Sequence, residues 1–359
     1  MNLESIKILQ KQLSSLFGVS GFEDEVGDFI IDKIEREGLA DKVWKDPLGN
    51  ILAIKDGNEG DNRILFDAHT DEIGFMVSHI ETQKSKSGFL RFVLIGAWDI
   101  RILLGQAVII KSKSGDIIPG IIGSKPPHLT SLNERKKTIN VDELYIDIGM
   151  SSYDEVINNG IDIGSVGTLY DPFIEFPNNM VRGKAFDDRT GCNVLLHLMK
   201  QLKEHSNIKD TILFNFAVQE EFGRIGAETG AFKLKPTMAI AVENTTAADV
   251  PGIQDSKIPV YIGRGPAITV ADKSIICSPK INNKLIENAK RQNIPYQIKK
   301  PMYGQTDAGK IQLTREGVPS TVVNVPCRYI HSPISLLKLD DIAYTIQLLD
   351  AFVRNPANL

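Results

Sequence analysis

The stretch Arg63-Ile64-Leu65-Phe66-Asp67-Ala68-His69-Thr70-Asp71 decides the fold class, because a short apolar run ends here in a histidine and an acid. An apolar run of this length predicts a strand that is buried on both faces. Such strands are typical of parallel sheets covered by helices, whose ligand sites collect at the carboxyl ends of the strands. We therefore expect His69 at the end of an α/β sheet where the carboxyl ends of its parallel strands form a functional site.

The same kind of sequence pattern returns after about residue 168, where apolar runs alternate with amphipathic stretches. Strands are predicted at 42–44, 50–54, 211–218, 238–242, 296–298 and 319–326, and helices at 23–37, 189–204, 225–231, 282–292 and 338–354. This alternation predicts an α/β fold with a mostly parallel central sheet and helices on both of its faces.

Between residues 72 and 165 the pattern changes to short alternating segments separated by Gly, Ser, Asn and Pro. These segments lie at 75–79, 89–94, 107–111, 117–122 and 144–148. Their spacing predicts a small all-β, barrel-like domain. Residues 1–71 and 166–359 then form one catalytic α/β domain, which residues 72–165 interrupt.

The composition of the chain argues against several classes of protein. The 359 residues carry a net charge of -4, which argues against a nucleic-acid partner because such partners usually require a basic face. No apolar run approaches the roughly 20 residues that span a bilayer, so we expect no membrane association. The first 18 residues lack the features of a signal peptide. The scattered cysteines Cys192, Cys277 and Cys327 fit a reducing cytoplasm.

The predicted strands share one feature, which is that four of them run into a possible metal ligand. These ligands are His69, Glu221, Glu243 and His331, and Asp187 adds a fifth just before a predicted helix. Two histidines with carboxylates suit zinc, cobalt or manganese. Five ligands are too many for one catalytic zinc, but they fit two divalent metal ions that share a carboxylate.

Two further acidic residues, Asp71 and Glu220, lie close in sequence to these ligands. Asp71 follows His69 by two residues, so in an extended chain it can hold the ring nitrogen of His69 that faces away from a metal. Glu220 and Glu221 are adjacent, and adjacent strand side chains diverge. One of the two is therefore expected to be a ligand and the other a general base.

Several motifs of the chain resemble the glutamyl/deblocking aminopeptidases that form tetrahedral dodecamers, some of whose members carry an endoglucanase label. The motifs are Ala68–Gly74, Phe186–Arg189, Gln219–Gly223 and Tyr329–Pro333, with Gly96–Asp99, Leu104–Gln106 and Ile122–His128 in the inserted segment. The resemblance implies a zinc-exopeptidase type of fold. It also implies a homo-oligomer, expected to be a dodecamer, whose inserted domain serves oligomerisation and substrate access.

The resemblance also implies which residues bind each of the two metals. It implies one metal on His69 and Glu243, a second on Glu221 and His331, and Asp187 as the bridge between them. In relatives the position of Glu243 is often Asp, so this residue departs from the usual pattern.

The remaining roles follow from the same resemblance. It implies Glu220 as the general base, Asp71 as the residue that orients His69, and a cis peptide between Asp187 and Asp188. The expected activity is that of a dinuclear aminopeptidase that hydrolyses N-terminal residues from peptides. In it, a water that bridges the two metals attacks the carbonyl carbon.

Two alternatives stay open at this point: a glycoside hydrolase that uses two carboxylates, and a non-catalytic metal-binding assembly protein. We expect His128 to serve an interface or the structure of the insert rather than a neighbouring active site. Arg264, Lys273 and the loop 303–307 are candidates for the substrate pocket, because the ligand set itself leaves side-chain preference open.

Overall fold

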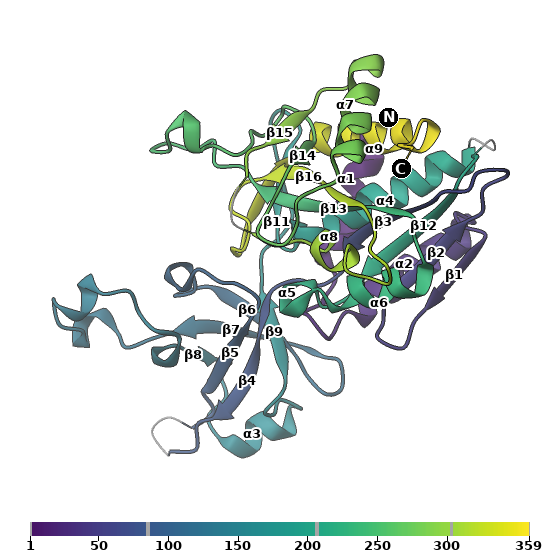
Figure 1. Ribbon diagram of the computed structural model, residues 1–359. Coiled ribbons are helices and arrows are strands. Elements are labelled where there is room, and N and C mark those ends of the chain that lie inside the picture. The colour runs from purple at the N-terminus through teal and green to yellow at the C-terminus, as the bar shows by residue number, and fades with distance from the viewer. Residues whose placement is uncertain (1, 84–86, 205–207, 302–303, 359) are drawn as a thin grey trace.

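The computed structural model describes residues 2–83, 87–204, 208–301 and 304–358. Its larger part is built on an eight-stranded mixed sheet (Figure 1). In spatial order the strands are β1 (Lys42–Lys45), β2 (Ile51–Lys55), β12 (Thr211–Ala217), β3 (Arg63–His69), β13 (Met238–Thr246), β16 (Ser320–Cys327), β14 (Ala267–Thr269) and β15 (Gln297–Lys299). The predicted α/β class is confirmed.

The four central strands β12, β3, β13 and β16 are parallel, as predicted. Antiparallel pairs flank them, where β2 joins β12 and β14 joins β16. All four central strands therefore present their carboxyl ends at one edge of the sheet.

Helices cover both faces of this sheet. One face carries α1 (Leu3–Ser15), α2 (Asp24–Glu37), α4 (Phe186–Glu204), α7 (Pro279–Gln292) and α9 (Leu339–Arg354), and the other carries α6 (Ile225–Leu234) and α8 (Ala308–Ile311). Within β3, Ile64 and Phe66 pack on the first face and Leu65 on the second. This alternation is the two-residue period of a strand that is buried on both sides.

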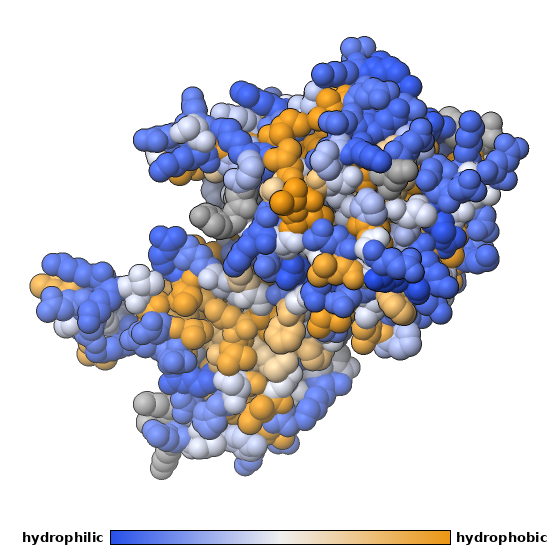
Figure 2. Space-filling view, viewed as in Figure 1, coloured by the Kyte–Doolittle hydropathy of each residue, from blue (hydrophilic) through white to orange (hydrophobic). Residues whose placement is uncertain are grey.

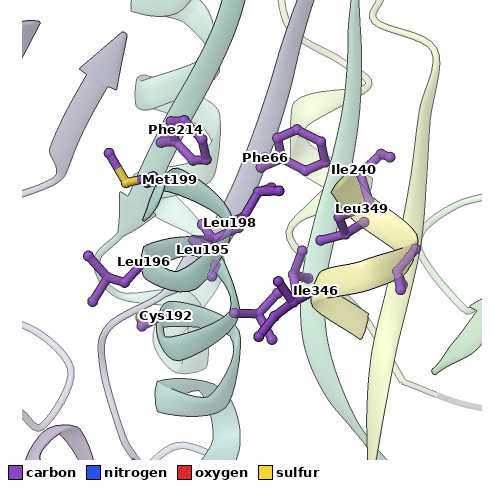
Figure 3. Packing of buried hydrophobic residues seen from close by; sticks show 14 of the residues in the cluster. Phe66, Cys192, Leu195, Leu196, Leu198, Met199, Phe214, Ile240, Ile346 and Leu349 are labelled. Atoms are coloured by element: carbon purple, nitrogen blue, oxygen red, sulfur yellow. The ribbon is translucent and has the colours of Figure 1, made fainter. Parts of the chain in front are cut away.

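The larger core lies between the sheet and helices α4 and α9 (Figure 3). Phe66 of β3 stacks on Phe214 of β12 with ring centroids 6.0 Å apart. Leu195 and Leu198 of α4 pack in the same cluster. Helix α4, whose regular part follows the non-helical residues Asp187 and Asp188, is thereby packed against the strand that ends at His69.

A closed six-stranded barrel forms the second part of the molecule, which confirms the predicted barrel-like segment (Figure 1). Its strands, in order around the barrel, are β4 (Gly74–Ile80), β5 (Leu90–Ile95), β8 (Tyr145–Asp147), β7 (Ile117–Gly123), β6 (Ala107–Lys111) and β9 (Val166–Leu169), and α3 (Tyr153–Asn158) precedes β9. Because β9 closes the barrel, its strands extend to Leu169, beyond the predicted end of the insert at 165. The division into two domains stays a prediction.

Several short elements were not predicted. A three-stranded sheet contains β10 (Ile174–Phe176), β11 (Met180–Gly183) and β17 (Ser335–Lys338), and α5 is one turn (Glu220–Gly223). Short 3-10 turns are η1 (Ile100–Ile102), η2 (Pro127–Leu129), η3 (Glu134–Lys136), η4 (Val141–Glu143) and η5 (Asp255–Lys257). Elements this short have too few residues to show a period in the sequence.

One predicted boundary is wrong in a way that matters for function. Strand β13 does not end before Glu243 but continues to Thr246, because it stays paired with β16 as far as the pair Thr246 and Cys327. Glu243 therefore lies within a strand, opposite Asn324, rather than at a strand end. Among the described residues, no helix is long and apolar enough to cross a membrane.

The contact between α4 and the sheet predicts a large effect of core truncation. Leu198 is 0 % exposed, so Leu198→Ala should lower the free energy of unfolding by about 2–5 kcal/mol. Leu132→Ala is the matched control, because Leu132 is 76 % exposed and its truncation should have little effect. Thermal and urea unfolding of the two variants measure the difference. Equal midpoints would contradict this account of the core.

Candidate metal centre

The predicted ligands converge at the carboxyl edge of the parallel strands. His69 is the last residue of β3, and Glu243 lies in the neighbouring strand β13. Glu221 belongs to the single turn α5, which follows β12, and His331 lies after β16. All of them line one cavity together with Asp187. Segments far apart in the sequence thus meet at one point.

Asp187 occupies the middle of this group. Its Oδ1 lies 3.4 Å from Nε2 of His69, and its Oδ2 lies 3.3 Å from Nε2 of His331. Nε2 of His331 is also 3.3 Å from Oε1 of Glu221. Ligand atoms of His69, Asp187 and Glu221 all lie within 4.8 Å of one another. One carboxylate with an oxygen toward each histidine is the arrangement that a bridge between two ions requires.

Glu220 and Glu243 occupy the margin of the group. Oε2 of Glu220 is 3.9 Å from Nε2 of His69. Oε1 of Glu243 accepts a hydrogen bond of 2.7 Å from the backbone N–H of Asp307. Asp307 precedes α8, so this bond ties β13 to the loop that leads into that helix.

The carboxylate of Asp71 lies between the imidazole of His69 and the turn that carries Glu220 and Glu221. Its Oδ1 lies 3.2 Å from Nδ1 of His69 and accepts the N–H of Glu220 at 2.9 Å. Its Oδ2 accepts the N–H of Glu221 at 3.0 Å and the hydroxyl of Ser20. Asp71 is completely buried. One carboxylate therefore lies beside the imidazole and fixes the turn that carries Glu220 and Glu221.

The backbone around the site adopts uncommon conformations. The peptide between Asp187 and Asp188 is cis, as the resemblance implied. Gln219, Tyr329 and His331 have φ values of 57°, 61° and 57°, a region that residues other than glycine rarely occupy. Such positions cluster at functional sites, where the surrounding structure holds them.

A cluster of buried charged side chains lies next to the site, and it was not predicted from the sequence. Arg189 is fully buried and donates from Nε to the carbonyl of Thr70, between His69 and Asp71. Lys184 donates to Glu72 at 2.6 Å. Glu72 directly follows the His69–Asp71 segment, and Lys184 and Arg189 flank Asp187. The only signal in the sequence was that Glu72 and Arg189 stand inside two of the quoted motifs and that Lys184 shortly precedes one of them.

The electrostatics of the site favour bound cations. Burial raises the pKa of Glu220, Glu221 and Glu243 above its usual range. Burial alone would lower the pKa of His331, but Asp187 and Glu221 outweigh it and raise that pKa to about 11. Carboxylates thus outnumber the positive groups that face them. Two imidazoles with an excess of carboxylates form a donor set that fits divalent ions such as zinc, cobalt or manganese.

The sequence model of the M42 glutamyl aminopeptidase family matches residues 49–348. The chain belongs to this family. It is therefore a metal-dependent aminopeptidase, a hydrolase that acts on peptide bonds. The family assignment agrees with the geometry, because the matched residues include all five predicted ligands.

Two curated relatives show how function varies among similar chains. A lysyl aminopeptidase of Pyrococcus furiosus is 32 % identical over 348 residues, which are 96 % of either chain. A glutamyl aminopeptidase of Lactococcus lactis is 30 % identical and covers 96 % of this chain and 94 % of its own. Relatives at the same distance thus carry names that refer to opposite side-chain charges.

Two solved structures have the same fold. An aminopeptidase of Desulfurococcus kamchatkensis is 36 % identical, with a TM-score of 0.93, and the match covers 99 % of this chain and 96 % of that one. The TET1 peptidase of Pyrococcus horikoshii is 31 % identical, with a TM-score of 0.85 and coverages of 97 % and 99 %. It is described as assembling into a tetrahedron or a large octahedral shell.

Other predicted residues lie in different places. His128 is exposed in η2 of the barrel segment and does not line the catalytic cavity. Arg264 is not a lining residue either, since its guanidinium stacks on Tyr261. Lys273 does line the cavity, together with residues 304–306. Tyr303, the first residue of the predicted pocket loop, lies outside the described residues.

Metal removal should destabilise the folded chain, because the buried carboxylates would then repel one another. At ion concentrations about 1,000-fold above Kd, metal binding stabilises the fold by about 4 kcal/mol. We expect a chelator to lower the thermal midpoint, and zinc, cobalt or manganese, added in turn, to restore it. Asp187→Asn is the control, whose midpoint should respond weakly to the metals. If a chelator leaves the thermal midpoint of the parent chain unchanged, that result would contradict the proposed metal centre.

Proposed function

We propose that the chain removes N-terminal residues from peptides with two divalent ions, zinc or cobalt and alternatively manganese. His69 and Glu243 would hold one ion, Glu221 and His331 the other, and Asp187 would bridge them. The observation that carries this proposal is the position of Asp187, with one oxygen toward each histidine. Family membership favours this activity over a glycoside hydrolase or a non-catalytic assembly protein.

The chemistry divides between the ions and the protein. Two bound ions would polarise the scissile carbonyl and lower the pKa of an attacking water. Glu220 is the general base in this proposal: its carboxylate takes a proton from the water and passes it to the departing amine nitrogen. Its place at the margin of the ligand group supports this role, since its Oε2 is 3.9 Å from His69 Nε2.

Asp71 acts by positioning. Its two oxygens accept the N–H groups of Glu220 and Glu221, so it sets the distance between the proposed base and the proposed ligand. It also favours the tautomer of His69 that has the proton on Nδ1, which leaves Nε2 free to bind an ion. Neither task requires contact with the substrate.

The decisive test is Glu220→Gln. The variant keeps the shape of the side chain but cannot accept a proton, so kcat should fall by about 100-fold or more while both metals stay bound. Metal content by mass spectrometry and peptide turnover are measured together. Glu228→Gln is the control, because Glu228 is exposed and pairs with Lys310 away from the cavity. Near-normal turnover in Glu220→Gln would exclude the proposed role.

We also propose that the chain assembles into a dodecamer through the segment 72–165. This segment exposes large apolar side chains, among them Val93, Leu104, Ile117 and Ile121, and Figure 2 shows hydrophobic residues gathered over the barrel. Exposed apolar patches of this kind mark interaction surfaces. A cytoplasmic location is part of the proposal, since the three cysteines are free and buried.

Light scattering tests the assembly. At micromolar concentration we expect a mass twelve times that of the 39.7 kDa chain. Ile121→Glu places a charge on the exposed apolar surface of the barrel and should shift the mass toward smaller species without loss of fold. His128→Ala distinguishes the two expectations for that residue, since only a role in a neighbouring active site predicts a lower kcat in an intact assembly. A monomeric parent chain would contradict the proposal.

A further inference from the structure

A loop of the barrel segment reaches the metal centre. The loop, residues 96–99, follows strand β5, and Figure 1 shows the barrel beside the turn α5. Ala97 lines the catalytic cavity. Trp98 lines a second, much smaller cavity of about 20 Å³, whose wall also contains Asp187, Glu221 and His331. The barrel therefore forms part of the immediate surroundings of the predicted ligands.

This loop lies on the side of one of the two proposed ions. Glu221 and His331, which line the small cavity, are the ligands proposed for one ion. His69 and Glu243, proposed for the other ion, are not among its lining residues within the described part of the chain. The loop is therefore placed to affect the first of these ions rather than the second.

The carboxylate of Glu221 lacks the polar support that other predicted ligands have. Nδ1 of His69 lies 3.2 Å from Asp71, and Oε1 of Glu243 accepts a backbone N–H at the start of α8. Asp71 holds only the backbone N–H of Glu221. Among the described residues, the polar contact of its carboxylate is Nε2 of His331 at 3.3 Å, which is itself a predicted ligand. The orientation of this carboxylate therefore depends on packing.

Gly96 and Ile73 form a wall beside this carboxylate. A Cβ atom at position 96 would lie 3.4 Å from Oε2 of Glu221 and only 2.4 Å from Cγ2 of Ile73, closer than heavy atoms that share no bond approach one another. Gly96 also has a φ of 81°, a region in which glycine is favoured. Both the space and the backbone conformation therefore require a glycine here.

Trp98 attaches this wall to the ends of two barrel strands. Its indole N–H donates to the carbonyl of Gly74 at 3.0 Å and to that of Ile95 at 2.9 Å. Its ring packs against the core of the barrel. The hydroxyl of Thr168 donates to the carbonyl of Ile73 at 3.2 Å. Strands β4, β5 and β9 of the barrel thus hold the wall in place.

We infer that residues 96–99 of the barrel are part of the metal centre, where Gly96 positions the carboxylate of Glu221 for the ion that it shares with His331. The inference rests on the proposed function. Gly96 does not line the catalytic cavity and acts by packing, so it is a positioning residue. The barrel then has a task in catalysis in addition to its proposed tasks in assembly and substrate access.

The test is metal binding by Gly96→Ala. After treatment with a chelator, the parent and the variant are titrated with cobalt by calorimetry, and bound cobalt is counted by mass spectrometry. The added methyl group should displace the carboxylate of Glu221, so one ion should bind about 10-fold or more weakly while the other binds as in the parent. Peptide turnover at limiting cobalt should fall and should recover in excess cobalt, a recovery that a general folding defect does not show.

Gly105→Ala is the matched control. Gly105 lies in the same barrel segment with a φ of 79°, but a Cβ atom there would meet no atom within 4 Å. The control therefore introduces similar backbone strain without the contact, and it should bind both ions as the parent does. Trp98→Phe is a second test variant, which keeps an aromatic ring but lacks the N–H group. It should weaken the same ion to a smaller extent.

A double variant identifies the affected ion. His331→Ala removes a proposed ligand of the ion beside the loop and leaves the proposed ligands of the other ion. Addition of Gly96→Ala to this variant should not change the affinity for the remaining ion, because the two substitutions act on the same ion and their effects are then not additive.

Three results would overturn the inference: parental affinity for both ions in Gly96→Ala, equal weakening of both ions, or a further loss of the remaining ion in the double variant. If circular dichroism shows that Gly96→Ala does not fold, Trp98→Phe decides, and unchanged metal binding in it would also overturn the inference. A parent enzyme that binds both ions but cleaves no peptide would contradict the proposed activity, while the titrations would still decide the role of Gly96.

Discussion

The constraint on which the rest of the structure depends is an excess of buried carboxylate at the carboxyl edge of the sheet. Asp187, Glu221 and Glu243 lie around two imidazoles, in a place where water cannot fully solvate their charge. In such surroundings ionised carboxylates are tolerated only beside positive charge. Divalent ions provide that charge, so folding, metal binding and activity are linked in one region of the chain.

The scaffold meets this constraint by joining the segments that carry the predicted ligands to one another through contacts of the protein itself. Asp71 accepts both N–H groups of the turn at Glu220 and Glu221, and Arg189 binds the carbonyl of Thr70. Helix α4 places Arg189 there because its apolar face is packed against Phe66 and Phe214. The precision of the centre therefore comes from ordinary core packing and from two buried side chains that touch no substrate.

The cavity has one side formed by the predicted metal ligands and another side formed by residues outside that set. Reaction at the metal centre requires only a carbonyl and an amine, which every peptide offers, so the centre itself cannot choose among substrates. The rest of the cavity is lined by residues outside the predicted ligand set, which come from β15 and from the turns at Arg224 and Lys273.

Much of this molecule was determined by its sequence alone, because strand burial, helical period and the terminal residue of a strand are local properties. The α/β class and the barrel segment follow from such local patterns, and so does the prediction of the candidate ligands from His69 to His331. Only the tertiary structure decided three other features: the continuation of β13 past Glu243, the support of the site by Lys184 and Arg189, and the burial of Lys299 beside the cavity. The reason is physical, since each of these depends on which distant segment lies alongside. Strand pairing with β16 extends β13, Lys184 pairs with Glu72 from a distant segment, and Lys299 is buried where β15 meets the cavity.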